Sequence, residues 1–241
     1  VQLVDGLPMI GQVNGRLDLT DKSVAASEIT GRGFGGPLRV KVGSEGGKVL
    51  VSAAGSAAIG EVASHFGWPL VDQLAGSTPW KADIAIQKRN AYVLVTSDLV
   101  GISSPLPDPL NKTATARLPL RIERSAPNAG SEQYRITLGD VARGTVVRRD
   151  GKWTQGVFAV GSGDASLPPQ GLVVRLAAPR LDGDAWRTFL GLGKNGNGGN
   201  ADGGLALAEV SVKTPQLHLF GSEYRDIDLR VAPQGAAWRI S

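Results

Sequence analysis

Cysteine is absent from this chain of 241 residues, which excludes a disulfide framework and a metal site built on thiolates. Aromatic residues make up only 5% of the chain, so its apolar residues are mostly valine, leucine, isoleucine and alanine. No apolar run reaches the length of a transmembrane helix. The chain begins at Val1 without an initiator methionine, and we expect it to be a fragment of a longer protein that carries any membrane anchor.

Residues that interrupt regular structure are abundant, with 33 glycines and 14 prolines spread along the chain. This frequency favours many short strands over long helices. The formal net charge is +4, but lysine and arginine occur singly and not in clusters with stacking aromatics. Such scatter is typical of a solvated sheet face, and it argues against a nucleic-acid partner.

Apolar residues alternate with polar ones along most of the chain, as they do in strands with one buried face. Leu38, Val40 and Val42, for example, alternate with basic residues. Near the end of the chain the pattern predicts separate strands at Leu205–Val212 and Gln216–Phe220. A strand-rich sheet protein follows from this periodicity.

Two segments have helical spacing instead, at about Ala57–Phe66 and Asp182–Leu190, and Asp182 suits the N-cap of the second. Asp150–Gly151 is a strong signal for a type I′ hairpin turn. The stretch Lys194–Gly204 has the composition of a flexible loop. We therefore predict two short helices among many strands.

The segment Ser97–Arg124 is the most informative part of the sequence. Pro105, Pro107 and Pro109 stand at every second position, and proline cannot donate a hydrogen bond to a neighbouring strand. We expect an extended connector at the rim of the sheet. After it, strict alternation resumes and places four apolar residues on one face: Ala116, Leu118, Leu120 and Ile122.

These patterns together predict a mainly β fold, an elongated and twisted antiparallel sheet curled into an open groove, with two short helices. The expected division is into residues 1–124 and residues 125–241, each a β-groove unit with one helix. The polar stretch Ser125–Ser131 is predicted to be the loop between them. The similar make-up of the halves indicates an internal structural repeat.

No constellation of catalytic or metal-binding residues emerges from the sequence. His65 and His218 lack a second histidine or a nearby carboxylate at ligand spacing, so both are interpreted as structural. There is no G-x-S-x-G elbow, and a single glycine-rich stretch at Gly198–Leu207 does not make a calcium-binding repeat array. We expect no enzyme activity, no metal and no cofactor.

The apolar strand faces are the one feature that can carry a function. Two short helices are too little material to cover so many strands, and a large uncovered apolar strip usually marks a binding surface. Acyl chains would fill such a groove without any specific polar residue. Fifteen residues are the groove-facing, lipid-binding candidates: Leu38, Val40, Val42, Ile84, Ile86, Tyr92, Leu94, Leu118, Leu120, Ile122, Ile136, Leu138, Leu172, Val174 and Leu176.

The five tryptophans are spread evenly and are interpreted as packing residues, one for each structural unit. A second interpretation places some of them at the mouth of a groove, where an amphipathic ring suits the boundary between lipid head and tail. They are Trp68, Trp80, Trp153, Trp186 and Trp238.

An ordered series of motifs resembles the YhdP/AsmA-like family of Gram-negative envelope proteins. The series is LAGSTPW, SDLVG, PLPDPLNK, PLRIER, GKWTQGVFAVGSG, LDGDAWRTFL and LFGSEYRDIDLRVAPQGAAWRI. The resemblance implies a periplasmic segment of a protein anchored in the inner membrane, with a long groove of strands that moves phospholipids toward the outer membrane. Its partners would be phospholipid acyl chains and the remainder of the parent chain.

Two alternatives stay open at this point. The chain could be a structural or interaction module of the envelope with a closed sandwich core, and then Ile84→Asp or Leu120→Asp would unfold it. It could also be an envelope hydrolase, although no catalytic set supports that interpretation.

Overall fold

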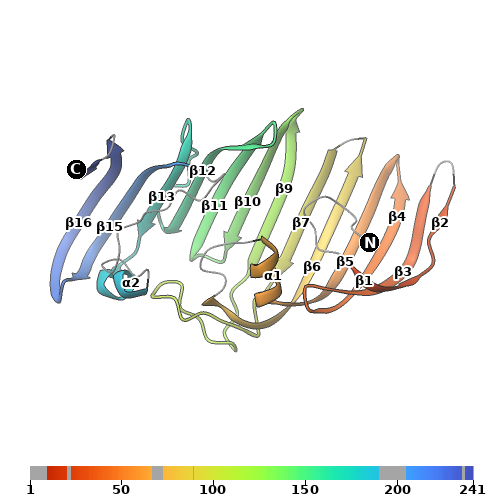
Figure 1. Ribbon diagram of the computed structural model, residues 1–241, viewed down its shortest axis with the longest axis horizontal. Coiled ribbons are helices and arrows are strands. Elements are labelled where there is room, and N and C mark those ends of the chain that lie inside the picture. The colour runs from red at the N-terminus through yellow and green to blue at the C-terminus, as the bar shows by residue number, and fades with distance from the viewer. Residues whose placement is uncertain are drawn as a thin grey trace. The chain divides into compact units, whose positions relative to one another are not determined.

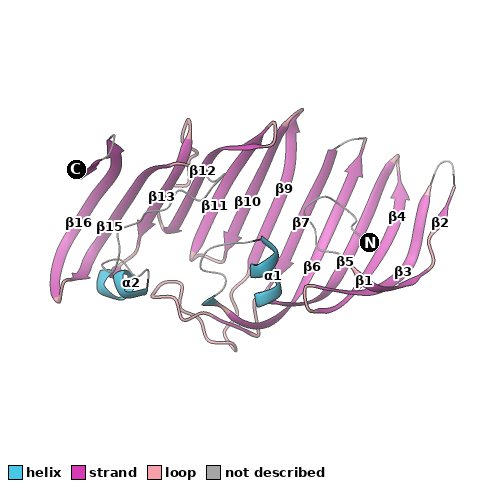
Figure 2. Ribbon diagram, in the orientation of Figure 1, coloured by secondary structure: helices cyan, strands magenta, loops and turns pink. Residues whose placement is uncertain are grey.

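The computed structural model describes residues 10–20, 23–66, 73–88, 90–189, 205–234 and 237–240. Within them the fold is mainly β, an open, mixed and mostly antiparallel sheet of seventeen strands with two short helices (Figure 2). This confirms the predicted fold class. The predicted loop at Lys194–Gly204 lies outside the described residues.

The chain divides into two compact units. Unit 1 comprises residues Val1–Pro105 and Lys112–Ala126, and unit 2 comprises Leu106–Asn111 and Pro127–Ser241. The proline-rich connector predicted from the sequence therefore belongs mostly to unit 2, although its neighbours on both sides belong to unit 1.

Unit 1 is a run of antiparallel strands in which sequence neighbours pair with one another from β3 to β7 (Figure 1). β9 follows β7 in the pairing order, and β1 and β2 both pair with β3. Its strands are β1 Gly11–Gly15, β2 Asp18–Leu19, β3 Val24–Gly33, β4 Gly36–Glu45, β5 Lys48–Ala58, β6 Ala75–Gln87, β7 Asn90–Ser97, β8 Ile102–Ser103 and β9 Leu120–Asn128.

Strand β9 begins later and ends later than the alternation predicts. The residues from Ala116 to Pro119 are not in a strand, and Ser125 to Asn128 continue β9 instead of forming the predicted polar loop. The reason is the pairing partner: β7 offers ladder positions opposite Leu120 to Arg124 and not before them. Of the four alternating residues only Leu120 and Ile122 lie in β9, because the partner strand decides where the ladder forms.

The segment after β7 is fixed by Lys112, which is only 7% exposed. Its ammonium group donates three hydrogen bonds to backbone carbonyls, to Leu99 at 2.7 Å, Ile102 at 2.8 Å and Thr113 at 3.0 Å. All three donors of the amine are thereby used. Burial lowers the pKa of the Lys112 amine. The backbone of Lys112 also exchanges two hydrogen bonds with Ser104, which closes the loop between them.

Unit 2 combines antiparallel and parallel pairing. β10–β11–β12 and β15–β16–β17 are antiparallel, whereas β13 pairs parallel with β12 and with β15, and β14 pairs parallel with β15. Its strands are β10 Ser131–Leu138, β11 Ala142–Arg149, β12 Lys152–Gly161, β13 Gly171–Ala177, β14 Arg180–Asp182, β15 Leu207–Leu219, β16 Ser222–Gln234 and β17 Ala237–Ile240.

Strand β15 is one continuous strand where the sequence predicts two. Pro215 interrupts the alternation, but it falls where the parallel partner of β15 changes from β13, which ends its pairing at Lys213, to β14, which begins at Gln216. The missing N–H of proline is therefore not needed there. Thr214, only 2% exposed, accepts a hydrogen bond from the Gln216 N–H and donates one to the Gln216 carbonyl.

Each unit contains one helix, α1 Ile59–Phe66 in unit 1 and α2 Gly183–Phe189 in unit 2. Both lie within a residue or two of the helices predicted from spacing. Asp182 caps α2 as expected, because its carboxylate accepts a hydrogen bond from the Ala185 N–H at 2.8 Å.

The two helices pack against the same kind of turn. The β3–β4 turn at Phe34–Gly35 contacts α1, where Phe34 and His65 make an edge-to-face ring contact at 6.1 Å. The β15–β16 turn at Phe220–Gly221 contacts α2. Both turns have positive φ at both central residues, the type I′ geometry that matches strand twist, and glycine supplies it at the second position.

The buried amine leads to a stability prediction. Lys112→Met keeps the aliphatic stem but leaves three carbonyls without their donor, and we expect the free energy of unfolding to fall by about 3 kcal/mol. The control is Lys81→Met, since Lys81 is exposed. Urea denaturation of both variants measures the difference, and equal stability would contradict the assigned role of Lys112.

Candidate lipid-binding faces

In unit 1 the strand register gathers aliphatic side chains on one face. Partners that lie directly opposite in antiparallel strands project to the same side, so the register identifies the face residue by residue. One row across the strands reads Ile29, Val40, Ala53, Ala82, Val95 and Ile122. The next row reads Ala26, Val42, Val51, Ile84 and Val93. We call these residues, with Leu38, Trp80, Ile86 and Leu120, the unit 1 apolar face.

The sequence-predicted candidates of unit 1 divide between the two sides of the sheet. Most of them lie together on the unit 1 apolar face: Leu38, Val40, Val42, Ile84, Ile86, Leu120 and Ile122. Tyr92 and Leu94 lie on the opposite face, because Ile84 is paired with Val93. Tyr92 and Leu94 therefore do not share a face with the other groove-facing candidates of this unit, which corrects the prediction. Leu118 precedes β9 and is not part of the ladder, although its N–H donates to the Asp98 carbonyl.

The phase error in β7 has a simple cause. Val93 and Val95 are as apolar as Tyr92 and Leu94, so neither phase of the alternation is marked by polar residues. An error of one residue in the predicted alternation exchanges these two pairs of side chains between the faces of the sheet. Tyr92 shows the polar character of its side, since its hydroxyl donates to Glu123 at 2.8 Å and this bond raises the pKa of the tyrosine.

Exposure differs between residues of the unit 1 apolar face. Leu38 and Val40 are 5% and 6% exposed, and Ala82 is also buried, whereas Val51 and Ile84 are half-buried. Trp80 belongs to this face, and its indole N–H is buried without an acceptor among the described residues. The face thus offers partly exposed aliphatic side chains next to a buried indole donor.

Unit 2 has an apolar face of its own, and all five predicted residues of this unit lie on it. Ile136, Gly144, Phe158, Val174, Val210 and Val231 form one row across the strands. Leu138, Ala142, Val160, Leu176, Val212 and Leu229 form the next, and Tyr134, Val146, Gly156 and Leu172 form a third. These three rows are the unit 2 apolar face.

On the other side of unit 2, strands β11 to β13 are covered by the protein's own chain. The connection from β12 to β13, residues 162–170, must return to the start of a parallel strand, and it crosses this side. Arg175 donates from Nη1 to the Asp164 and Ser166 carbonyls of the connection at 3.1 and 3.2 Å. Val157 and Ala159 on this side are 0% exposed, whereas the unit 2 apolar face has mostly half-buried side chains.

None of the aromatic residues on the unit 2 apolar face was among the fifteen groove-facing candidates, although Trp153 was one of the tryptophans that the sequence placed either in packing or at the mouth of a groove. Phe158 is 36% exposed and covers Gly144, where any Cβ would collide with its ring. Trp153 packs on Tyr134 with ring centroids 5.4 Å apart. An irregularity in the β11–β12 register pairs Arg148 with Trp153, which brings Trp153 onto the side of Tyr134. Simple alternation from Phe158 would have placed Trp153 on the other side.

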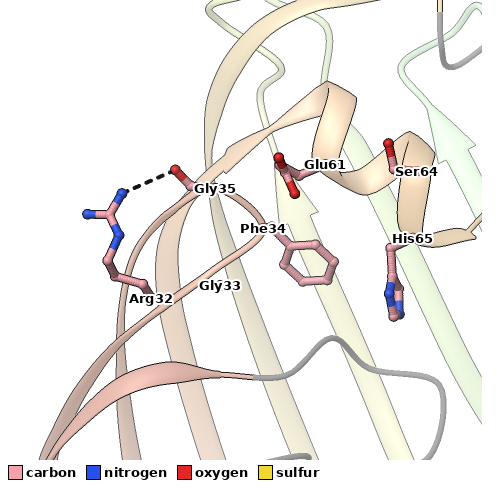
Figure 3. A pocket seen from close by; sticks show the side chains of 7 residues that line it. All are labelled: Arg32, Gly33, Phe34, Gly35, Glu61, Ser64 and His65. Carbon is pink, nitrogen blue, oxygen red and sulfur yellow. Dashed lines mark hydrogen bonds between the residues drawn. The ribbon is translucent and has the colours of Figure 1, made fainter.

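A hollow beside α1 in unit 1 has a volume of about 430 Å³ (Figure 3). Arg32, Glu61, Ser64 and His65 are among its lining residues. Ser64 donates to the Gly60 carbonyl of its own helix at 2.8 Å. Figure 3 shows the Ser64 and His65 side chains pointing away from each other, so they do not form a nucleophile and base pair.

Asp184 is the centre of the polar contacts in unit 2. Its carboxylate accepts hydrogen bonds from the N–H groups of Gly221 at 2.8 Å and Phe220 at 2.9 Å. These backbone donors, with smaller contributions from Arg187 and His218, hold the pKa of Asp184 below its ordinary value. His218 Nε2 lies 3.6 Å from the same carboxylate, a contact that the sequence analysis did not predict.

The comparisons with known proteins identify the family. The family model described as YhdP protein matches residues 1–241, the whole chain. The chain belongs to the YhdP family. No curated protein and no solved structure matches it. The match confirms the resemblance that the ordered motifs indicated.

Three of the stretches that carry the family resemblance meet at α2. The Trp186 indole N–H donates to the Asp108 carbonyl at 3.1 Å, which joins the helix to the proline-rich connector. Asp184 joins the same helix to the β15–β16 turn (Figure 1). The YhdP-like residues in these stretches therefore build one structural junction within unit 2.

Among the described residues, no group of three or more histidine, aspartate or glutamate side chains could hold a metal ion. No helix in the described part of the chain is long and apolar enough to cross a membrane.

The lowered pKa of Asp184 leads to a pH-dependent prediction. Its contribution to stability is fully present above the unfolded pKa of about 3.9 and is lost as the pH falls through the lower folded value. Asp184→Asn should therefore melt at a lower temperature than wild type between pH 5 and 7 (roughly the plateau of this dependence), and the gap should close in acid.

The matched control is Asp226→Asn, because Asp226 has a positive φ of 54° that asparagine also tolerates. Thermal melts monitored by circular dichroism across the pH range measure the effect. A constant difference between Asp184→Asn and wild type at all pH values would contradict the ionic role of this carboxylate.

Proposed function

We propose that this chain is a segment of a periplasmic phospholipid-transfer conduit, in which the apolar faces of the two units shield acyl chains between the inner and outer membranes. The observation that carries the proposal is the register itself, which gathers aliphatic rows on one face of each unit. Membership of the YhdP family supports the same interpretation. The remainder of the parent chain would supply the inner-membrane anchor.

The chemistry of these faces suits acyl chains better than it suits a small polar substrate. Each CH₂ group moved from water to an apolar surface contributes about 0.8 kcal/mol, and this gain needs no specific polar partner. Rows of valine, isoleucine and leucine interrupted by alanine and glycine offer a smooth surface without fixed positions. A lipid tail on such a surface gains affinity while it stays free to slide.

The hydrogen bonds made by the polar residues agree with lipid transfer that involves no catalysed reaction. Lys112, Asp184 and Ser64 are engaged in hydrogen bonds that fasten loops, turns and a helix. We infer that the segment is not an enzyme and that it binds the acyl chains of lipids through its apolar faces.

The first experiment is native mass spectrometry of the chain purified from a Gram-negative host, followed by lipid extraction. We expect phospholipid to copurify at near-integer stoichiometry. A protein mass free of lipid, unchanged after incubation with phospholipid vesicles, would favour the alternative of a structural envelope module with a closed core.

A pair of charged substitutions separates these alternatives further. Ile84→Asp places a carboxylate in the unit 1 apolar face, and Leu50→Asp places one on the opposite side of the neighbouring strand, where Leu50 is 39% exposed. Because a carboxylate repels acyl chains, we expect Ile84→Asp to stay folded and lose copurified lipid by about tenfold, with no loss for Leu50→Asp.

The readouts are circular dichroism for folding and quantitative lipid extraction for loading. Unfolding of Ile84→Asp would indicate a closed core in place of an open face. A folded Ile84→Asp variant that retains its lipid would remove the unit 1 apolar face from the proposal.

A further inference from the structure

Polarity on the unit 2 apolar face changes along the strands toward the β11–β12 turn. The row of Leu138 is aliphatic, the row of Ile136 also contains Phe158, and the next row contains Tyr134. Beyond it the register pairs Glu132 with Arg148 and Arg148 with Trp153, so charged groups and an indole share the last row. The face is therefore aliphatic at one end and both aromatic and charged at the other. A glycerophospholipid has the same change of polarity from tail to head group, and tryptophan and tyrosine suit the interface.

Arg148 is held in place by one hydrogen bond, by a ring contact and by an ion pair with Glu132. Its Nε–H donates to the Gly151 carbonyl at 3.0 Å, and its guanidinium lies 5.8 Å from the ring centroid of Trp153. Its Nη1 lies 3.6 Å from a carboxylate oxygen of Glu132, which is too long for a hydrogen bond. The side chain is 42% exposed. One fixed N–H thus orients a guanidinium whose Nη groups make no hydrogen bond within the described residues.

We propose that Arg148 and Trp153 bind the phosphodiester head group of a lipid whose acyl chains lie on the unit 2 apolar face. The proposal rests on the proposed function, because the acyl chains bring the head group to this place. The Nη groups of this planar guanidinium make no hydrogen bond among the described residues, although Nη1 forms an ion pair with Glu132, and they match a phosphate in a two-point hydrogen-bonded geometry. The indole of Trp153, 41% exposed, lies beside it at the boundary between head and tail.

A residue next to the β11–β12 turn provides a matched control for Arg148. Arg149 is the next residue, and it lies on the other side of the strand, where its Nη2 donates to Gln155 at 3.3 Å. Arg148→Gln and Arg149→Gln remove the same charge at nearly the same distance from the turn. They differ in the face from which the charge is removed.

The experiment measures binding of two fluorescent lipid probes with identical acyl chains, a phosphatidyl lipid and a diacylglycerol without phosphate. We expect Arg148→Gln to weaken binding of the phosphatidyl probe by about fivefold, as loss of a partly exposed charged hydrogen bond would, and to leave diacylglycerol binding unchanged. Arg149→Gln should change neither. Inorganic phosphate, which lacks acyl chains, should not compete at millimolar concentration, and effective competition would indicate a site for free phosphate instead.

Failure of the head-group site can be distinguished from failure of the proposed function. If neither probe binds the wild-type chain, the proposed function fails and the head-group site fails with it. If both probes bind but Arg148→Gln and Arg149→Gln weaken the phosphatidyl probe equally, the conduit proposal stands and the site at Arg148 is overturned in favour of general electrostatic attraction. Circular dichroism of both variants checks that each is folded.

Discussion

The pairing register of the strands is the constraint on which the rest of this structure depends. Once Ile84 is placed opposite Val51 and Val93, every other residue of β5, β6 and β7 is assigned to a side. Aliphatic residues gather on one side, and the contact between Tyr92 and Glu123 falls on the other. This sorting is what creates the unit 1 apolar face, and a shift of one residue would remove it.

In both units a hairpin turn packs against a short helix. A type I′ turn of Phe–Gly projects from a hairpin onto a short helix that directly follows a strand, with Phe34 against α1 and Phe220 against α2. A helix of seven or eight residues is not stable alone, so each depends on contacts of this kind. The contacts differ in chemistry, since α1 uses a ring contact with His65 and α2 uses the Asp184 carboxylate. The repetition of this arrangement agrees with the internal repeat that the sequence indicates.

Much of this fold could be predicted from the sequence because its signals are local. Hairpin turns such as Asp150–Gly151 and the cap at Asp182 are encoded within a few residues, and both are present. The errors arise where a distant partner decides. Strand β9 starts where β7 offers it a ladder, β15 runs through Pro215 because its neighbour changes there, and Trp153 reaches the unit 2 apolar face through a register irregularity. The alternation of apolar and polar residues contains no information about which strands pair, so it could not predict these features.

Polar residues hold loops and turns in place, whereas apolar residues form extended faces. This arrangement favours a function that is spread over a surface. Lys112 and Asp184 are residues that an enzyme could use, yet each is engaged by backbone groups of a loop or turn. A ligand that must move along a protein is served poorly by strong, localised partners, because each one adds a barrier to the next step. Aliphatic rows give affinity in proportion to contact area without preferring one position. A guanidinium such as that of Arg148, fixed at the rim of such rows, could then orient a moving lipid by its head group while its tails stay free to slide.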